Sequence, residues 1–189
     1  MPDKQFALSP LRQARRDLIL ERAEILFVQR GVRATTMEAV AEAAGMSKVT
    51  VYGYFQDKHL LFENVAERVA SRLCDVVLEA LAHKGDPEKI IANGLIAKHL
   101  FVWELVRASV FASELFAAKS EFAAGAFKRL DETIEGRISN ILRQHRVHQP
   151  GALARIVFGA ANGVANRATS KLQLKRDLYR LLSELLRQT

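Results

Sequence analysis

The chain has 189 residues, a formal net charge of +7, 49% hydrophobic residues and 26% charged residues. This composition is typical of a globular protein and argues against a disordered chain, and the length allows a sizeable core in one or two domains. The positive charge is compatible with an anionic partner, but it does not by itself establish DNA binding.

The single cysteine and the absence of long apolar runs bear on the compartment. Cys74 has no second cysteine in the chain to pair with, which fits a reducing environment. The amino-terminal residues lack the apolar core of a signal peptide, and no uncharged apolar run approaches the ~18 residues of a membrane span. We therefore expect a cytoplasmic protein with no membrane partner.

The positive charge is unevenly distributed. Residues 137–189 contain ten Lys or Arg against two Asp or Glu, whereas residues 1–58 contain nine against seven. A solvated helix face explains such an excess, as does an acidic effector or partner near the carboxyl terminus.

Apolar periodicity predicts helices along the whole chain, and the alternating pattern of strands is absent. Residues 1–11 lack periodicity and are expected to form an arm. This arm is either solvated or, with Lys4, Arg12, Arg15 and Arg16, in contact with DNA phosphates. Outside the central stretch the expected helices are 12–30, 58–83, 87–101, 103–118, 121–147, 150–171 and 174–188.

The stretch 35–62 predicts two short helices joined by a tight turn and followed by the start of a third. Thr35 and Thr36 both precede the first helix and either can cap it. Glu38 stands three residues after Thr35, which is the spacing of a capping box. Gly45 can adopt the left-handed conformation that ends a helix without strain.

The second short helix has an exposed surface suited to a DNA major groove. Ser47 can cap it, and Val51 and Phe55 are four residues apart, so both should point into the core. The side chains left outside offer a cation, a hydroxyl, aromatic rings and an apolar contact to phosphates and base edges. These residues are Lys48, Val49, Thr50, Tyr52 and Tyr54.

Four segments occur in order over about residues 12–65, namely ILFVQRG, ATTMEAVAEAAGMS, KVTVYGYF and QDKHLLF. Together they resemble the DNA-binding half of the TetR (tetracycline-repressor-like) family of bacterial regulators. The family usually starts its second helix at the position of Thr36. Tyr54 stands where many members have His, and either side chain can donate to a phosphate.

The resemblance implies an all-α fold with two domains. An N-terminal arm and three-helix helix-turn-helix DNA-binding domain, residues 1–58, is joined by a long helix 4 to a C-terminal helical bundle. That bundle, residues 59–189, would bind an effector and form the dimer.

The resemblance also implies phosphate contacts beside the second short helix. Lys58 is at the first position of the helix that Asp57 caps, where a cation is unfavourable unless a phosphate arrives at the same place. The predicted DNA-binding residues are Thr36, Lys48, Val49, Thr50, Tyr52, Tyr54 and Lys58.

The second half contains aromatic residues that predict either plain core or a pocket. Helices that are apolar on more than one face, such as HLFVWELVRASVFASELF, must be buried in a bundle or line a cavity. The resemblance implies an effector site here, for a small molecule that is apolar or aromatic and could be anionic. The candidate pocket residues are His99, Trp103, Phe111, Phe116, Phe122 and Phe127.

The last two expected helices contain small residues and a leucine stripe. Gly159 and Gly163 are four apart, which lets another helix approach closely. In the family these helices form a four-helix dimer interface, whereas the alternative is that they pack only within the monomer. The candidate interface residues are Val157, Gly159, Ala160, Gly163, Val164, Leu178, Leu182 and Leu185.

Sequence motifs of catalysis are absent. The chain has no Gly-rich phosphate loop, H-E-x-x-H motif or cysteine pair. His145 and His148 are three apart but lack a nearby carboxylate or thiol. We therefore expect no enzyme activity, cofactor or metal.

Three functions remain. The first is a homodimeric transcriptional repressor that a small-molecule effector releases from a palindromic double-stranded operator. The alternatives are an all-helical protein-interaction module that uses the same helix-turn-helix, and a DNA binder without an effector.

Overall fold

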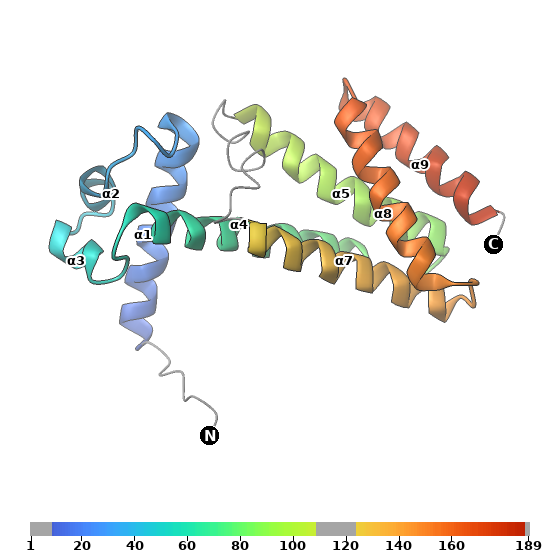
Figure 1. The fold of residues 1–189 in the computed structure, drawn as a ribbon, viewed down its shortest axis with the longest axis horizontal. Coiled ribbons are helices and arrows are strands. Elements are labelled where there is room, and N and C mark those ends of the chain that lie inside the picture. The colour runs from blue at the N-terminus through green and yellow to red at the C-terminus, as the bar shows by residue number, and fades with distance from the viewer. Residues whose placement is uncertain (1–8, 109–123, 188–189) are drawn as a thin grey trace. The chain divides into compact units, whose positions relative to one another are not determined.

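The computed structural model describes residues 9–108 and 124–187 (Figure 1). All regular secondary structure in these residues is helical, which confirms the predicted all-α class. The helices are α1 (Pro10–Arg30), α2 (Met37–Ala43), α3 (Lys48–Tyr52), α4 (Lys58–Ala80), α5 (Pro87–Ala108), α7 (Ala124–Gln144), α8 (Pro150–Arg167) and α9 (Lys171–Arg187). Within the described ranges, no helix combines the length and apolar character needed to cross a bilayer.

The chain forms two compact units, and the boundary between them lies inside α4. The first unit reaches Arg68 and also contains the end of α5 from Val106, whereas the second unit contains Val69–Leu105 and the chain from Gly125 on. The domain boundary predicted between residues 58 and 59 stays a prediction. The helix break predicted between residues 101 and 103 is wrong, because no Gly or Pro interrupts the apolar pattern there and α5 continues to Ala108.

In the first unit α1 and the start of α4 supply much of the apolar core. The predicted stripe of Ile19, Ala23, Leu26 and Phe27 is buried. The ring of Phe27 meets the ring of Phe62 edge to face, with centroids 5.8 Å apart. Such aromatic pairs stabilise beyond their buried area, so this contact holds α1 against α4.

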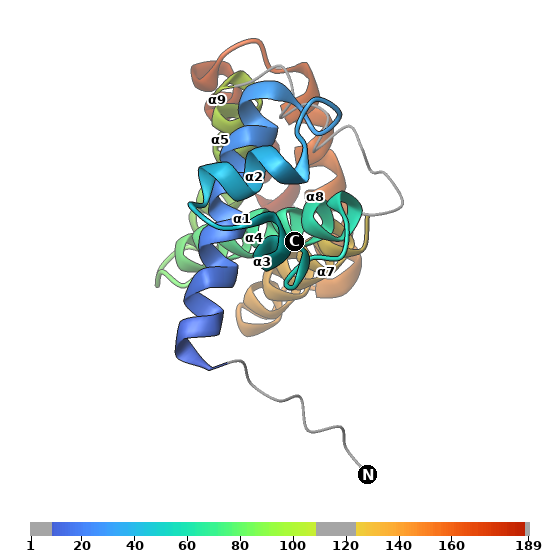
Figure 2. The same cartoon turned by 90° about the vertical axis from the view of Figure 1, so that its left-hand side faces the viewer.

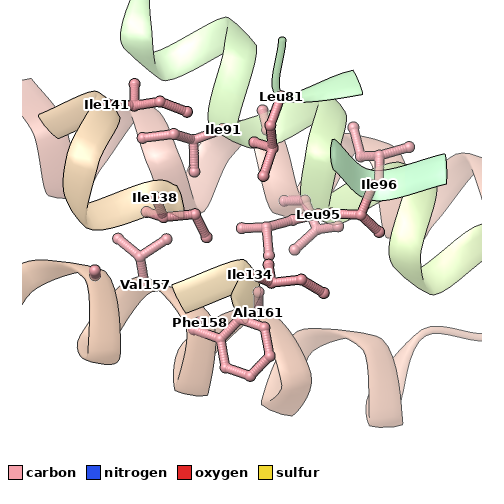
Figure 3. Close-up of a cluster of buried hydrophobic side chains, with 14 of the residues drawn as sticks. Leu81, Ile91, Leu95, Ile96, Ile134, Ile138, Ile141, Val157, Phe158 and Ala161 are labelled. Carbon is pink, nitrogen blue, oxygen red and sulfur yellow. The ribbon is translucent and has the colours of Figure 1, made fainter. Parts of the chain in front are cut away.

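The core of the second unit is built from α4, α5, α7, α8 and α9. Figure 3 shows side chains from several of these helices in one cluster, among them Leu95, Ile134 and Phe158. Leu95 and Ile134 are 0% exposed. Burying one such side chain contributes about 1.5–3 kcal/mol, so this cluster dominates the stability of the unit.

Gly94 is a position where α5 has no room for a side chain. A β-carbon there would clash with Leu81 Cδ2, and Leu81 is 1% exposed. We expect Gly94→Ala to lower the free energy of unfolding by about 1–3 kcal/mol, because overpacking outweighs the gain in helix propensity. Urea denaturation followed by circular dichroism measures this change.

The matched control is Gly136→Ala on α7, where no atom lies within 4 Å of the added β-carbon. That substitution should raise the stability by up to about 1 kcal/mol through helix propensity alone. The same effect from both substitutions would contradict the close packing of Gly94 on Leu81.

Candidate nucleic-acid interface

Thr36 caps α2, and Thr35 does not. The Thr36 hydroxyl accepts a hydrogen bond from the Ala39 N–H at 3.2 Å. Thr35 is 1% exposed, and its hydroxyl donates to the Gly31 carbonyl at 2.8 Å. The capping box suggested by Thr35 and Glu38 is therefore wrong, because the Thr35 side chain is turned into the protein.

The turn between α2 and α3 is formed by Gly45 in the predicted left-handed conformation, with φ of 63°. The N–H of Met46 returns to the Ala41 carbonyl at 2.9 Å, which closes the end of α2. Ser47 then caps α3 by accepting from the Thr50 N–H at 3.1 Å. The turn thus fixes where α3 begins and how it is oriented relative to α2.

The two faces of α3 differ as predicted. Val51 and Phe55 are 0% and 1% exposed, so they anchor this segment in the core of the first unit. Val49 is 82% exposed and Tyr52 is 39% exposed. Helix α3 ends at Tyr52, so Tyr54 follows the helix instead of belonging to it. Figure 2 presents α1, α2 and α3 toward the viewer.

The start of α1 lies beside the residues that follow α3. The Arg12 guanidinium is 5.7 Å from the centroid of the Tyr54 ring. Tyr54 is half-buried, and this cation–π contact restricts its ring. A cation of α1 therefore stands next to a predicted DNA-binding residue, a neighbour that sequence spacing alone does not reveal.

Lys58 occupies the start of α4, where Asp57 caps the helix by accepting from the Leu60 N–H at 2.8 Å. The Lys58 ammonium donates to the Arg33 carbonyl at 3.2 Å. An ammonium has three donors, so this bond leaves capacity for a phosphate oxygen. Lys58 thereby also ties the segment before α2 to α4.

The ionic contact between α2 and α3 was not among the predicted features. The Glu38 carboxylate pairs with the Lys48 ammonium, which also lies 5.6 Å from the centroid of the Tyr52 ring. Their mutual hydrogen bond is the main cause that lowers the pKa of Glu38 and raises the pKa of Lys48. Opposite charges ten residues apart across a turn were the only signal available.

The predicted effector residues are described only in part. His99 is 8% exposed, and its Nε2 is buried without a hydrogen-bond partner among the described residues. Burial, followed by the charge of Lys98, lowers the pKa of His99 to about 3, so its imidazole is neutral. Trp103 and Phe127 are half-buried. The remaining candidates, Phe111, Phe116 and Phe122, lie outside the described residues.

A buried lysine in the second unit was also missed. Lys98 is 8% exposed, and its ammonium donates to Asn162 Oδ1 at 2.8 Å and lies 3.6 Å from Asp131 Oδ1. It also lies 4.4 Å from the centroid of the Phe158 ring. The available signal was its position three residues after Leu95, on the buried face of α5.

The predicted interface residues of α8 and α9 divide into two groups. Val157, Leu178 and Leu182 are 0% exposed and belong to the core of the protomer, so their side chains are not available to a second subunit. Apolar stripes of this kind look alike in sequence whether they face the protomer or a partner. Gly159 and Gly163 are exposed, whereas the others are half-buried, namely Ala160, Val164 and Leu185.

The exposed part of α8 and α9 is nevertheless apolar in places. An added β-carbon at Gly159 or Gly163 would meet no atom within 4 Å. Ile156, Leu172 and Tyr179 are 56%, 79% and 39% exposed. These exposed residues were not among the predicted interface positions.

Residues 19–65 match the model of a family described as bacterial regulatory proteins, tetR family. The HTH-type transcriptional regulator AcrR of Shigella flexneri is 36% identical over 85 residues, which cover 44% of this chain and 40% of AcrR. The uncharacterized HTH-type transcriptional regulator YhgD of Bacillus subtilis is 26% identical over 129 residues, which cover 68% of this chain and 65% of YhgD. The chain thus spans less than two thirds of either curated relative.

Solved structures extend the similarity of fold beyond the matched segment. A TetR-family transcriptional regulator from Mesorhizobium loti has a TM-score of 0.77 at 21% identity, covering 93% of this chain and 96% of its own. A SmeT–triclosan complex has a TM-score of 0.66 at 24% identity, covering 93% and 91%. The amino-terminal segment is thus similar to the tetR family of bacterial regulatory proteins, and the fold of most of the chain is shared with these solved structures.

Proposed function

We propose that the chain is a DNA-binding transcriptional regulator, acting as a homodimeric repressor that a small-molecule effector releases from a palindromic operator. The observation that carries this proposal is the division of α3 into a buried face and a face on which Lys48, Val49 and Tyr52 are exposed. Val51 and Phe55 hold the helix, while Val49 and Tyr52 are left accessible to a partner. The relatives named as transcriptional regulators support the same reading.

In the proposed complex α3 enters the major groove, where the first residues of a recognition helix contact base edges. Lys48, Thr50 and Tyr52 would donate to phosphates or bases, and Val49 would contact a thymine methyl. Tyr54 would donate to a phosphate. Thr36 and Lys58 would bind phosphates on either side of the groove, so they position the protein without reading sequence.

The purified chain is first used to enrich a duplex from a random pool. Two substitutions then separate the roles of these residues in binding that duplex. Tyr52→Ala should weaken binding to the selected duplex by about 1–3 kcal/mol, the range of a lost base contact. Lys58→Ala should weaken all duplexes alike and reduce the salt slope by roughly 0.9. Lys89→Ala, an exposed cation on α5, is the control that leaves both properties unchanged.

Fluorescence anisotropy at several salt concentrations measures these effects. Failure to enrich any duplex would favour the protein-interaction module instead. Equal affinity in the wild-type, Tyr52→Ala and Lys58→Ala proteins would show that α3 and α4 do not form the DNA-binding surface.

We assign dimerisation to the exposed surface of α8 and α9. Gly159 and Gly163 leave open space that a helix of a second subunit can fill at close range. Ile156 and Leu172 are large apolar side chains exposed on the same two helices, and burial of such groups drives subunit association. Two-fold symmetry of the dimer then requires an operator whose half-sites are one helical turn, or a multiple of it, apart.

Gly163→Arg tests this assignment. A long charged side chain on the proposed contact surface should convert the dimer to a monomer and weaken operator binding. The free energy of unfolding of the protomer should change by no more than about 0.5 kcal/mol, as for other surface substitutions. Light scattering after size exclusion measures the mass. Gly136→Arg on α7 is the control, and a dimer that survives Gly163→Arg would place the contact elsewhere.

The effector is proposed to bind in the second unit near His99. The buried Nε2 of His99 has no hydrogen-bond partner in the described part of the chain, which is costly, and a ligand polar atom can remove that cost by hydrogen bonding to it. A buried, neutral imidazole suits an apolar or aromatic ligand. The structural neighbour SmeT is described as a complex with triclosan, which supports a small-molecule site in this fold.

Release would follow from a shift between conformations. A ligand changes the populations only as far as it binds one conformation better than the other. Helix α4, like α5, contains residues of both units. We propose α4 as the element through which ligand occupancy in the second unit alters the helix-turn-helix of the first. Operator affinity that no ligand of a broad panel changes would favour a DNA binder without an effector.

The pKa of His99 predicts a dependence of stability on pH. It is about 3 in the folded chain against the ordinary 6.5, so the unfolded chain binds more protons between these values. His99 therefore destabilises the fold as the pH falls below about 6.5, by up to about 1.4 kcal/mol per pH unit. His99→Leu should flatten this dependence between about pH 6.5 and pH 5, as measured by urea denaturation.

The control is His83→Gln, which removes an exposed imidazole and should leave the pH dependence in place. A His99→Leu protein with the wild-type pH dependence would contradict the neutral, buried state of this side chain.

A further inference from the structure

The exposed ion pair between Glu38 on α2 and Lys48 on α3 bears on DNA binding as well as on the packing of the two helices. The Glu38 and Lys48 side chains are 54% and 56% exposed, so DNA and salt reach both. Their hydrogen bond and charge attraction lower the pKa of Glu38 and raise the pKa of Lys48, so both are ionised at neutral pH. Because water and ions screen an exposed pair, this contact adds little to folding and is readily exchanged.

Lys48 is the first residue of α3, and it lies where a recognition helix reaches the base edges. Its ammonium is not free in the unbound protein, because it contacts the Glu38 carboxylate and lies near the Tyr52 ring. To bind DNA through Lys48, the protein must replace a carboxylate acceptor by a DNA acceptor. At the same time the carboxylate of Glu38 comes close to the negatively charged backbone.

This exchange has different consequences for different duplexes. On a duplex that presents no base acceptor within reach of Lys48, the ammonium can bind only phosphates. The gain is then offset by the loss of the Glu38 contact and by repulsion of the Glu38 carboxylate. On a site that presents the O6 and N7 acceptors of guanine, Lys48 gains a directed contact that phosphates do not provide. The carboxylate therefore suppresses sequence-independent binding more than specific binding.

We infer that Glu38 is a specificity-determining residue of the DNA interface, because its contact with Lys48 makes that cation add to affinity only where the sequence offers a base acceptor. The inference rests on the proposed function, since it concerns the same surface. It assigns to an acidic residue of α2 a role that the predicted set of DNA-binding residues did not contain.

The chain provides a matched control on the same helix. Glu42 is also exposed on α2 and is one helical turn from Glu38, and none of the described residues pairs with its carboxylate. Glu42→Gln removes the same charge as Glu38→Gln and leaves Lys48 paired. Any difference between the two variants therefore reports the pair and not the general charge of the surface.

The test measures binding of the full chain to the enriched duplex and to a scrambled duplex of equal length, over a range of salt concentrations. Glu38→Gln should raise affinity for the scrambled duplex several-fold and steepen its salt slope by roughly 0.9, the effect of one additional phosphate contact. The ratio of specific to scrambled affinity should fall several-fold. Lys48→Gln should reverse the gain in the Glu38→Gln background but hardly change scrambled binding in the wild-type background.

Two results overturn the inference while leaving the proposed function intact. One is an equal gain from Glu38→Gln and Glu42→Gln on the scrambled duplex. The other is an additive effect of Glu38→Gln and Lys48→Gln in which affinity for both duplexes falls equally and the melting temperature of the protein is lower. That pattern is expected if the ion pair only stabilises the fold. Failure of the wild-type chain to bind any duplex would overturn the inference and the proposed function together.

Discussion

The burial of Val51 and Phe55 is the constraint on which the proposed DNA-binding surface depends. A helix as short as α3 is not stable in isolation, because too few hydrogen bonds offset the cost of nucleating it. These two side chains, 0% and 1% exposed, supply the missing stabilisation, while Gly45 and Ser47 fix where the helix begins. Since one face of α3 is committed to the core, the remaining side chains are presented outward in a defined order.

The two units differ in how exposed their cationic side chains are. In the first unit Lys48 is exposed and Lys58 is half-buried. Their ammonium groups contact the Glu38 carboxylate and the Arg33 carbonyl, and an anion can replace or share these contacts. In the second unit Lys98 is buried, with Asn162, Asp131 and an aromatic ring around its ammonium, and His99 is neutral. The first arrangement suits a polyanion that binds from outside, whereas the second suits specific recognition within a packed bundle.

Local pattern predicted most of the helices and the buried face of α3, because apolar periodicity records which side of a helix meets the core. Contacts between separate elements were not predictable in the same way. Whether Thr35 or Thr36 caps α2 depends on which of them the fold buries, and the partners of Arg12 and Glu38 are known only once α1, α2 and α3 are assembled. Leu178 and Leu182 were placed at a subunit surface because an apolar stripe is the same in sequence whichever surface it meets.

The claim that the helix-turn-helix carries the DNA-binding surface competes with the distribution of charge, since residues 137–189 contain most of the excess of Lys and Arg. Hydrogen–deuterium exchange of the intact chain, with and without a duplex that it has enriched, distinguishes the two locations. We expect DNA to slow exchange in peptides covering residues 36–58 and to leave exchange in α7 unchanged. Protection confined to α8 and α9, with residues 36–58 exchanging as in the free protein, would contradict it.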